Sequence, residues 1–137
     1  MEKSLEQEVR RRANGRCEYC LLPEMAVPES FQFDHIIARQ HGGTTTSDNL
    51  AICCAHCNRH KGPNLAGVDP TSGRVLPLFH PRRGRWEDHF AWRGPVLEGL
   101  TDTGRATITV LRMNAPSLLS LRSALIVEGE FPAAGTS

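Results

Sequence analysis

Two Cys-x-x-Cys pairs stand far apart in the sequence, with a spacing typical of metal ligands. Cys17 and Cys20 form the first pair, Cys54 and Cys57 form the second, and 33 residues separate them. Four thiolates suit a tetrahedral Zn²⁺ with Zn–S distances of ~2.3 Å, and such a closed shell is structural rather than catalytic. The pairs predict a structural zinc site, and their long insert should itself be folded. Cys53, the fifth cysteine, is interpreted as a small buried apolar residue.

A second group of chemically active residues lies inside that insert and just after it. Asp34 and His35 are adjacent, Asn49 follows a Gly-Gly loop, and Asn58 comes directly after the second cysteine pair. The imidazole of a histidine can accept a proton near neutral pH, and carboxylate and amide oxygens can bind a divalent cation. The set therefore combines a proton acceptor with oxygen ligands, which is what metal-assisted hydrolysis requires.

The chain around these residues predicts a strand, a loop, a second strand and a short helix, in that order. Residues 31–36 alternate apolar and polar side chains, as a half-buried strand does, and residues 38–49 are rich in Gly, Thr and Ser. Residues 50–53 form a short apolar run that suits a second strand. The helix is expected over 54–61, where a Gly-Pro pair ends it.

The flanking segments predict further elements that cover this unit. A helix is expected from Ser4, as its N-cap, to about residue 14, with Gly15 as the stop. Residues 103–113 could be a strand or a helix, and the spacing of their apolar residues favours a helix. The other expected segments are a loop over 63–75, apolar anchors at 76–79 and 89–92, a strand over 96–100, a helix over 116–128 and a frayed tail at 131–137.

The ordered set of motifs resembles the HNH family of ββα-metal endonucleases. The resemblance covers residues 16–62 and is carried by both groups and by the residues between them. The matching residues are Cys17, Cys20, Asp34, His35, Ile36, Ile37, Gly42, Gly43, Asp48, Asn49, Leu50, Cys54, Cys57, Asn58 and Lys61. The resemblance implies an α+β fold with a ββα-metal (His-Me finger) core, a pair of zinc knuckles with four cysteine ligands and a C-terminal mixed α/β extension. We expect one domain, with an N-terminal helix in 1–15, the HNH nuclease core in 16–62 and the extension in 63–137.

The resemblance also implies a metal-dependent endonuclease that nicks DNA, and it assigns roles to single residues. His35 would be the general base that activates water, and Asp34 and Asn58 would hold the catalytic cation. Two oxygen donors favour Mg²⁺ or Mn²⁺, although His60 could supply a nitrogen instead. The side-chain amide of Asn49 would bridge backbone groups, hold the Gly-Thr loop closed and so orient His35.

The charge pattern allows a nucleic-acid contact but does not require one. Sixteen basic and 15 acidic residues give a formal charge of +1, so any such contact must be local. The predicted phosphate contacts are Arg39, Arg59, Lys61, Arg82 and Arg83. DNA is the expected partner, with RNA as an alternative substrate, and the protein could be a monomer or a homodimer.

Two further expectations concern the class of protein and its location. The alternative to an enzyme is a non-catalytic, zinc-stabilised module that binds nucleic acid. The start of the chain lacks the apolar run of a secretory signal, and no stretch approaches the ~18 apolar residues of a membrane span. The sequence therefore predicts a cytoplasmic protein with no membrane association.

Overall fold

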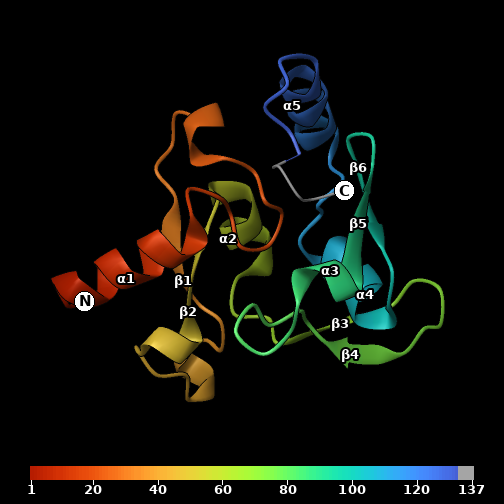
Figure 1. Cartoon of the computed structure of the whole chain (residues 1–137). Helices are drawn as coiled ribbons and strands as arrows, with labels where there is room; N and C mark the ends of the chain where they lie inside the picture. Colours follow the sequence, from red (N-terminus) through yellow and green to blue (C-terminus); the bar gives the residue numbers. More distant parts are fainter. Residues whose placement is uncertain (133–137) are drawn as a thin grey trace.

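The computed structural model describes residues 1–132, which form helices and three two-stranded antiparallel sheets. This is the α+β class that the sequence predicted (Figure 1). The elements are α1 (Lys3–Ala13), β1 (Gln32–His35), β2 (Leu50–Cys53), α2 (Ala55–Lys61), β3 (Ala66–Val68), β4 (Val75–Pro77), α3 (Trp86–His89), β5 (Phe90–Arg93), β6 (Val96–Gly99), α4 (Asp102–Val110) and α5 (Pro116–Val127). Short 3₁₀ turns occupy Glu24–Ala26, Arg39–His41 and Ser47–Asn49.

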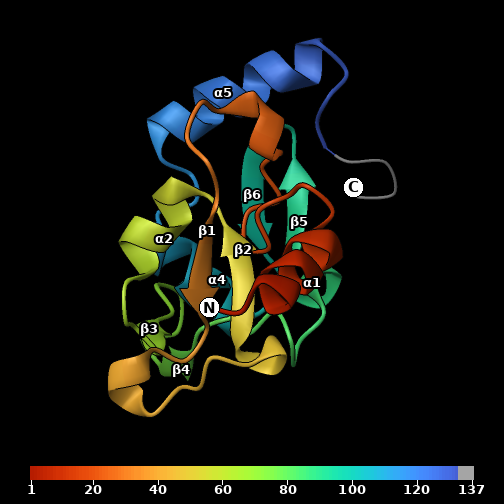
Figure 2. The same ribbon diagram turned by 90° about the vertical axis from the view of Figure 1, so that its left-hand side faces the viewer.

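The β1–β2 hairpin lies at the centre of the N-terminal half, as predicted. Its register pairs His35 with Leu50 and Gln32 with Cys53. All four residues of β2 are buried, because α1 lies against β2 and α2 lies against β1 (Figure 2). The hairpin and α2 therefore form one unit that carries both Asp34 and His35 on β1.

The first helix differs from the prediction at its start. Ser4 lies inside α1 instead of capping it, and its hydroxyl donates to the carboxylate of Glu2 at 2.7 Å. The C-terminal end is as expected, since Asn14 adopts a left-handed conformation before Gly15. Arg12 donates to the backbone oxygens of Ser47 and Leu50, so this arginine fastens α1 to the start of β2.

The predicted loop over 63–75 is wrong in part, because β3 forms there and pairs with β4. Gly67 makes this possible. A Cβ atom on Gly67 would lie 2.4 Å from a methyl carbon of Val110, so only a glycine lets α4 pack directly on the strand. Buried Asp69 follows β3 and accepts two hydrogen bonds of 2.9 Å from Arg105 of α4, which holds the pKa of that carboxyl well below its usual range.

The helices over 103–113 and 116–128 and the strand over 96–100 are confirmed as α4, α5 and β6. An aromatic side chain joins α3 to the segment of the first cysteine pair: the indole nitrogen of Trp86 donates to the backbone oxygen of Tyr19 at 2.8 Å. Phe131 is buried against Trp92, so the expected fraying is wrong for this residue, while residues 133–137 lie outside the described part. The division into 1–15, 16–62 and 63–137 stays a prediction.

Candidate zinc site and active site

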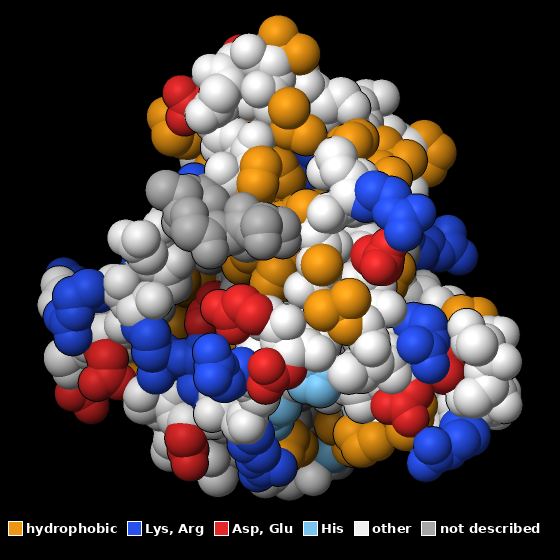
Figure 3. Space-filling model, turned by 45° about the vertical axis from the view of Figure 1, so that its right-hand side comes forward, with side chains coloured by type: hydrophobic (Ala, Val, Ile, Leu, Met, Phe, Trp, Pro, Cys, Tyr) orange, Lys and Arg blue, Asp and Glu red, His pale blue; other side chains and the backbone are white. Residues whose placement is uncertain are grey.

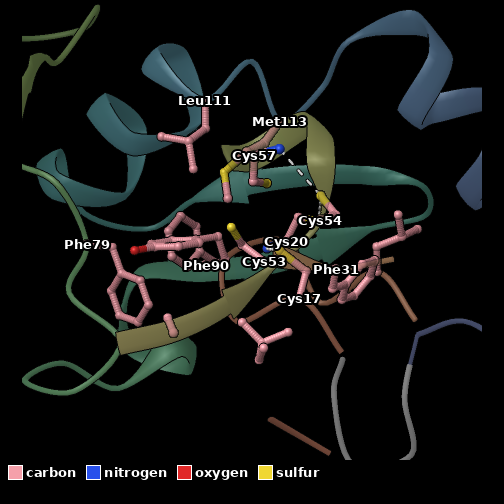
Figure 4. Close-up of a cluster of buried hydrophobic side chains, with 14 of the residues drawn as sticks. Cys17, Cys20, Phe31, Cys53, Cys54, Cys57, Phe79, Phe90, Leu111 and Met113 are labelled. Atoms are coloured by element: carbon pink, nitrogen blue, oxygen red, sulfur yellow. Dashed lines mark hydrogen bonds between the residues drawn. The ribbon is translucent and has the colours of Figure 1, made fainter. Parts of the chain in front are cut away.

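The structure brings the four predicted zinc ligands together at the centre of the core (Figure 4). The sulfur atoms of Cys17, Cys20, Cys54 and Cys57 all lie within 4.8 Å of one another, and those of Cys20 and Cys54 are 3.8 Å apart. A tetrahedral ion with Zn–S bonds of ~2.3 Å needs sulfur atoms roughly 3.8 Å apart. The geometry is therefore compatible with zinc.

Each pair of ligands sits on a turn whose backbone points toward the sulfur atoms. The N–H of Cys20 donates to Cys17 Sγ at 3.5 Å, and the N–H of Cys57 donates to Cys54 Sγ at 3.4 Å. Hydrogen bonds from the other three thiols lower the pKa of Cys54, whereas hydrogen bonds within the cluster raise the pKa of Cys20 and of Cys57. Deprotonation of all four thiols at these distances would need a cation to balance their charge, which agrees with a metal site.

Cys53 is fully buried, as its interpretation as an apolar residue predicted, and burial raises the pKa of its thiol.

Tyr19, inside the first knuckle, has a role that the sequence analysis missed. Its hydroxyl donates to Asp34 Oδ2 at 2.7 Å, so the zinc knuckle is joined directly to the strand of the candidate active site. A lone tyrosine within a knuckle gives no sequence signal for such a contact.

Asp34 lies in the interior, in contact with a buried lysine. The residue is 5% exposed, and Lys61 Nζ lies 3.3 Å from Oδ1 and 3.2 Å from Oδ2. Burial raises the pKa of Asp34, and the charge of Lys61 and the hydroxyl of Tyr19 oppose that rise. Both carboxylate oxygens therefore have protein partners in this structure.

His35 lies at the end of β1, half-buried, beside the Gly-Thr loop. Its Nε2 is 2.9 Å from the hydroxyl oxygen of Thr45. Asn58, on α2, donates its side-chain amide to the side-chain oxygen of Gln32. Gln32 and Asp34 are two apart on β1, and Asn58 and Lys61 are one turn apart on α2, so both predicted ligands lie where the strand and the helix face each other.

Among the described residues, no hydrogen bond joins His35 to Asp34 or to Asn58, so the convergence of the three on one ion stays a prediction. His60, the other candidate ligand, lies elsewhere on α2. Its ring is 4.4 Å from that of His56, whose Nε2 is 3.0 Å from the backbone oxygen of Leu111. This contact places the His56–His60 pair toward the end of α4.

Asn49 makes the contacts that were predicted for it. Its Oδ1 accepts from the N–H of Ile37 at 2.9 Å, and its Nδ2 donates to the backbone oxygens of Ile37 and Thr44 at 3.0 and 2.8 Å. Gly43 allows this closed loop, because a Cβ atom there would lie 1.6 Å from the backbone oxygen of Ile37. The amide thus holds both ends of the loop that carries Thr45, the partner of His35.

We expect Asn49→Ala to lower the free energy of unfolding by roughly 2–4 kcal/mol, because three partly buried hydrogen bonds to the backbone are lost. Thermal denaturation followed by circular dichroism measures the change. Asn64→Ala is the matched control, since Asn64 is exposed and should leave the melting temperature within about a degree of the parent. Equal melting temperatures for the two variants would contradict a bracing role for Asn49.

The predicted phosphate contacts divide into two groups. Arg39, Arg59 and Arg83 are exposed. Lys61 is 2% exposed, and Arg82 forms a largely buried ion pair with Glu18. The placement of Lys61 and Arg82 argues against the phosphate contacts predicted for them, because their charged groups bind carboxylates inside the protein.

The face of the molecule drawn in Figure 3 shows no broad field of one charge. On the face in Figure 3, basic and acidic side chains are interspersed, and hydrophobic side chains gather toward the top. Of the five predicted phosphate contacts, Arg83 is the one that lines two hollows in the surface of the described residues. One is formed with the Gly42–Thr44 loop and Asn49, and the other is a cavity of about 300 Å³ next to Ile36 and Lys61. A nucleic-acid contact would therefore be local to this region.

No helix among the described residues is long and apolar enough to cross a membrane.

Comparisons with curated proteins and with solved structures found no similar protein. The family model described as HNH endonuclease matches residues 17–64. This segment begins at the first zinc knuckle, contains the β1–β2 hairpin and ends just after α2. Over that segment the chain matches the HNH endonuclease family, as its motifs predicted.

Proposed function

We propose that the protein is a metal-dependent endonuclease that hydrolyses DNA phosphodiester bonds and nicks one strand at a time. The observation that supports this best is the bracing of the active-site loop by Asn49. Its three hydrogen bonds fix the loop that holds Thr45 against His35. A protein that only binds nucleic acid has no use for an imidazole held in this way on the strand that also carries Asp34.

His35 acts as the general base in this proposal. The hydroxyl of Thr45 contacts Nε2 and so fixes the plane of the imidazole. A fixed ring can remove a proton from a water molecule as the water attacks phosphorus, which avoids release of free hydroxide. Arg39, Arg59 and Arg83 are the exposed groups available to hold the flanking phosphates.

Asp34 and Asn58 are the proposed ligands of the catalytic cation. A carboxylate and an amide oxygen match the preference of Mg²⁺ and Mn²⁺ for oxygen donors, and both residues lie where β1 faces α2. When bound, the ion would stabilise negative charge on the leaving oxygen. The zinc cluster has a separate, structural role, because its four thiolates leave no open position.

The test is conversion of supercoiled plasmid to nicked circles by the zinc-loaded protein. We expect nicking with added Mg²⁺ or Mn²⁺ and none without them, with nicked circles formed before linear DNA because each chain has one site. A labelled RNA offered in parallel separates DNA from RNA as the substrate. Binding to DNA without cleavage under either ion would contradict the proposal and favour the non-catalytic binding module.

A further inference from the structure

The amino group of Lys61 lies among oxygen atoms. Besides the two carboxylate oxygens of Asp34, Nζ is 3.3 Å from the backbone oxygen of His35 and 3.0 Å from that of Ile36. The side chain is almost fully buried. Carboxylates and backbone carbonyls are also the ligands that hard divalent cations take in proteins. The amine therefore occupies a position with the ligand chemistry of a metal site.

We infer that the ammonium group of Lys61 occupies the position of the catalytic cation beside Asp34 while no divalent ion is bound. It moves away from Asp34 when a divalent ion binds. The inference rests on the proposed function, because it takes Asp34 as a ligand of the catalytic ion. Oxygen ligands lie about 2.0–2.1 Å from Mg²⁺. An ion bound to Asp34 would therefore lie next to the ammonium group. Two positive charges at so short a distance repel each other strongly in the protein interior.

The structure offers a place for the displaced side chain. Lys61 is the last residue of α2 and lines the cavity of about 300 Å³ whose walls include Leu65, Pro77 and Phe79. The side chain can turn into this space while the helix stays in place. Tyr19, the other partner of Asp34, keeps its hydrogen bond, because a hydroxyl carries no charge that opposes the ion.

The ion pair between Lys61 and Asp34 stabilises the protein without a divalent ion but weakens binding of that ion. Without a divalent ion, Lys61 neutralises a buried carboxylate that would otherwise be strongly destabilising. The apparent affinity for the divalent ion falls in proportion to the fraction of molecules in which Lys61 has left Asp34. Lys61 is thus a positioning residue that acts through Asp34, and it sets the ion concentration at which the enzyme works.

The wild-type protein provides a direct test, because its sequence contains two lysines, Lys3 and Lys61. Lys3 is exposed and serves as an internal reference. The zinc-loaded protein is treated with an amine-acylating ester with and without saturating Mn²⁺, and mass spectrometry follows each lysine. We expect acylation of Lys61 to accelerate at least about tenfold with Mn²⁺, while that of Lys3 is unchanged.

Two variants make the outcome sharper. Lys61→Met keeps an unbranched side chain, one atom shorter, and removes the charge, so the Mn²⁺ concentration at half-saturation, measured by titration, should fall at least about tenfold. Lys3→Met removes an exposed ammonium group on α1 instead, so half-saturation should stay near the parental value.

Unchanged acylation of Lys61 in a protein that cleaves DNA with Mn²⁺ would overturn this inference and leave the proposed function standing. A folded Lys61→Met protein with the parental half-saturation would do the same. Absence of both Mn²⁺ binding and cleavage would overturn the two proposals together.

Discussion

Replacing His35 by alanine should slow plasmid nicking by about 10²–10⁴-fold, which is the usual contribution of a general base. Without the imidazole, the attacking water has no positioned group to take its proton. Folding should change little, because the side chain is half-buried and, within the described part of the chain, makes one hydrogen bond, to Thr45. The measurement is the initial rate of nicking at saturating Mg²⁺ or Mn²⁺.

His41→Ala is the matched control for that experiment. His41 belongs to the same loop but is exposed, and none of the side-chain hydrogen bonds of the described residues involves it. Its loss should leave the rate within about twofold of the parent. A folded, zinc-loaded His35→Ala protein that nicks as fast as the His41→Ala protein would refute the assignment of His35 as the base.

The parts of the fold that the sequence predicted well are those that local patterns determine. β2 has the predicted bounds because Leu50–Cys53 is a continuous apolar run, and the Cys-x-x-Cys spacing holds each ligand pair on one turn. In both cases neighbours in the sequence decide the structure. The contacts of Asn49 were expected from the resemblance to the HNH family and not from a local pattern.

The parts that the sequence missed depend on distant partners. Lys61 and Arg82 were expected on the surface because charged side chains usually are. Their burial depends on Asp34, which is 27 positions from Lys61, and on Glu18, which is 64 positions from Arg82. β3 has no alternating pattern and forms because α4 packs closely on Gly67. None of these pairings could be inferred without the tertiary structure.

The candidate active site and the candidate zinc site are joined by direct contacts, and this link would make a structural ion matter for the proposed cleavage. Tyr19 lies between two zinc ligands and donates to Asp34, and the second knuckle leads directly into the helix that carries Asn58 and Lys61. Loss of the metal would release both sides of the candidate active site at once. Zinc is therefore expected to be needed for cleavage without taking part in it.

Removing the zinc ligands should have the largest effect on stability. Binding of structural zinc contributes about 10–16 kcal/mol in small zinc domains, which is as large as the whole stability of a typical domain, about 5–15 kcal/mol. The four sulfur atoms also lie in the main core, beside Phe31, Leu111 and Met113 (Figure 4). We expect the double variant Cys54→Ser, Cys57→Ser to lose zinc and to show no cooperative thermal transition.

Cys53→Ala is the matched control, because this cysteine is equally buried but lies outside the four-sulfur cluster. It should retain one zinc per chain, as measured by metal analysis, and lose only about 1–2 kcal/mol of stability. If the double variant instead melts like the Cys53→Ala protein, the cluster is an ordinary part of the core. Added Mg²⁺ should not restore nicking to the double variant, because the ion cannot rebuild the knuckle that holds Tyr19 against Asp34.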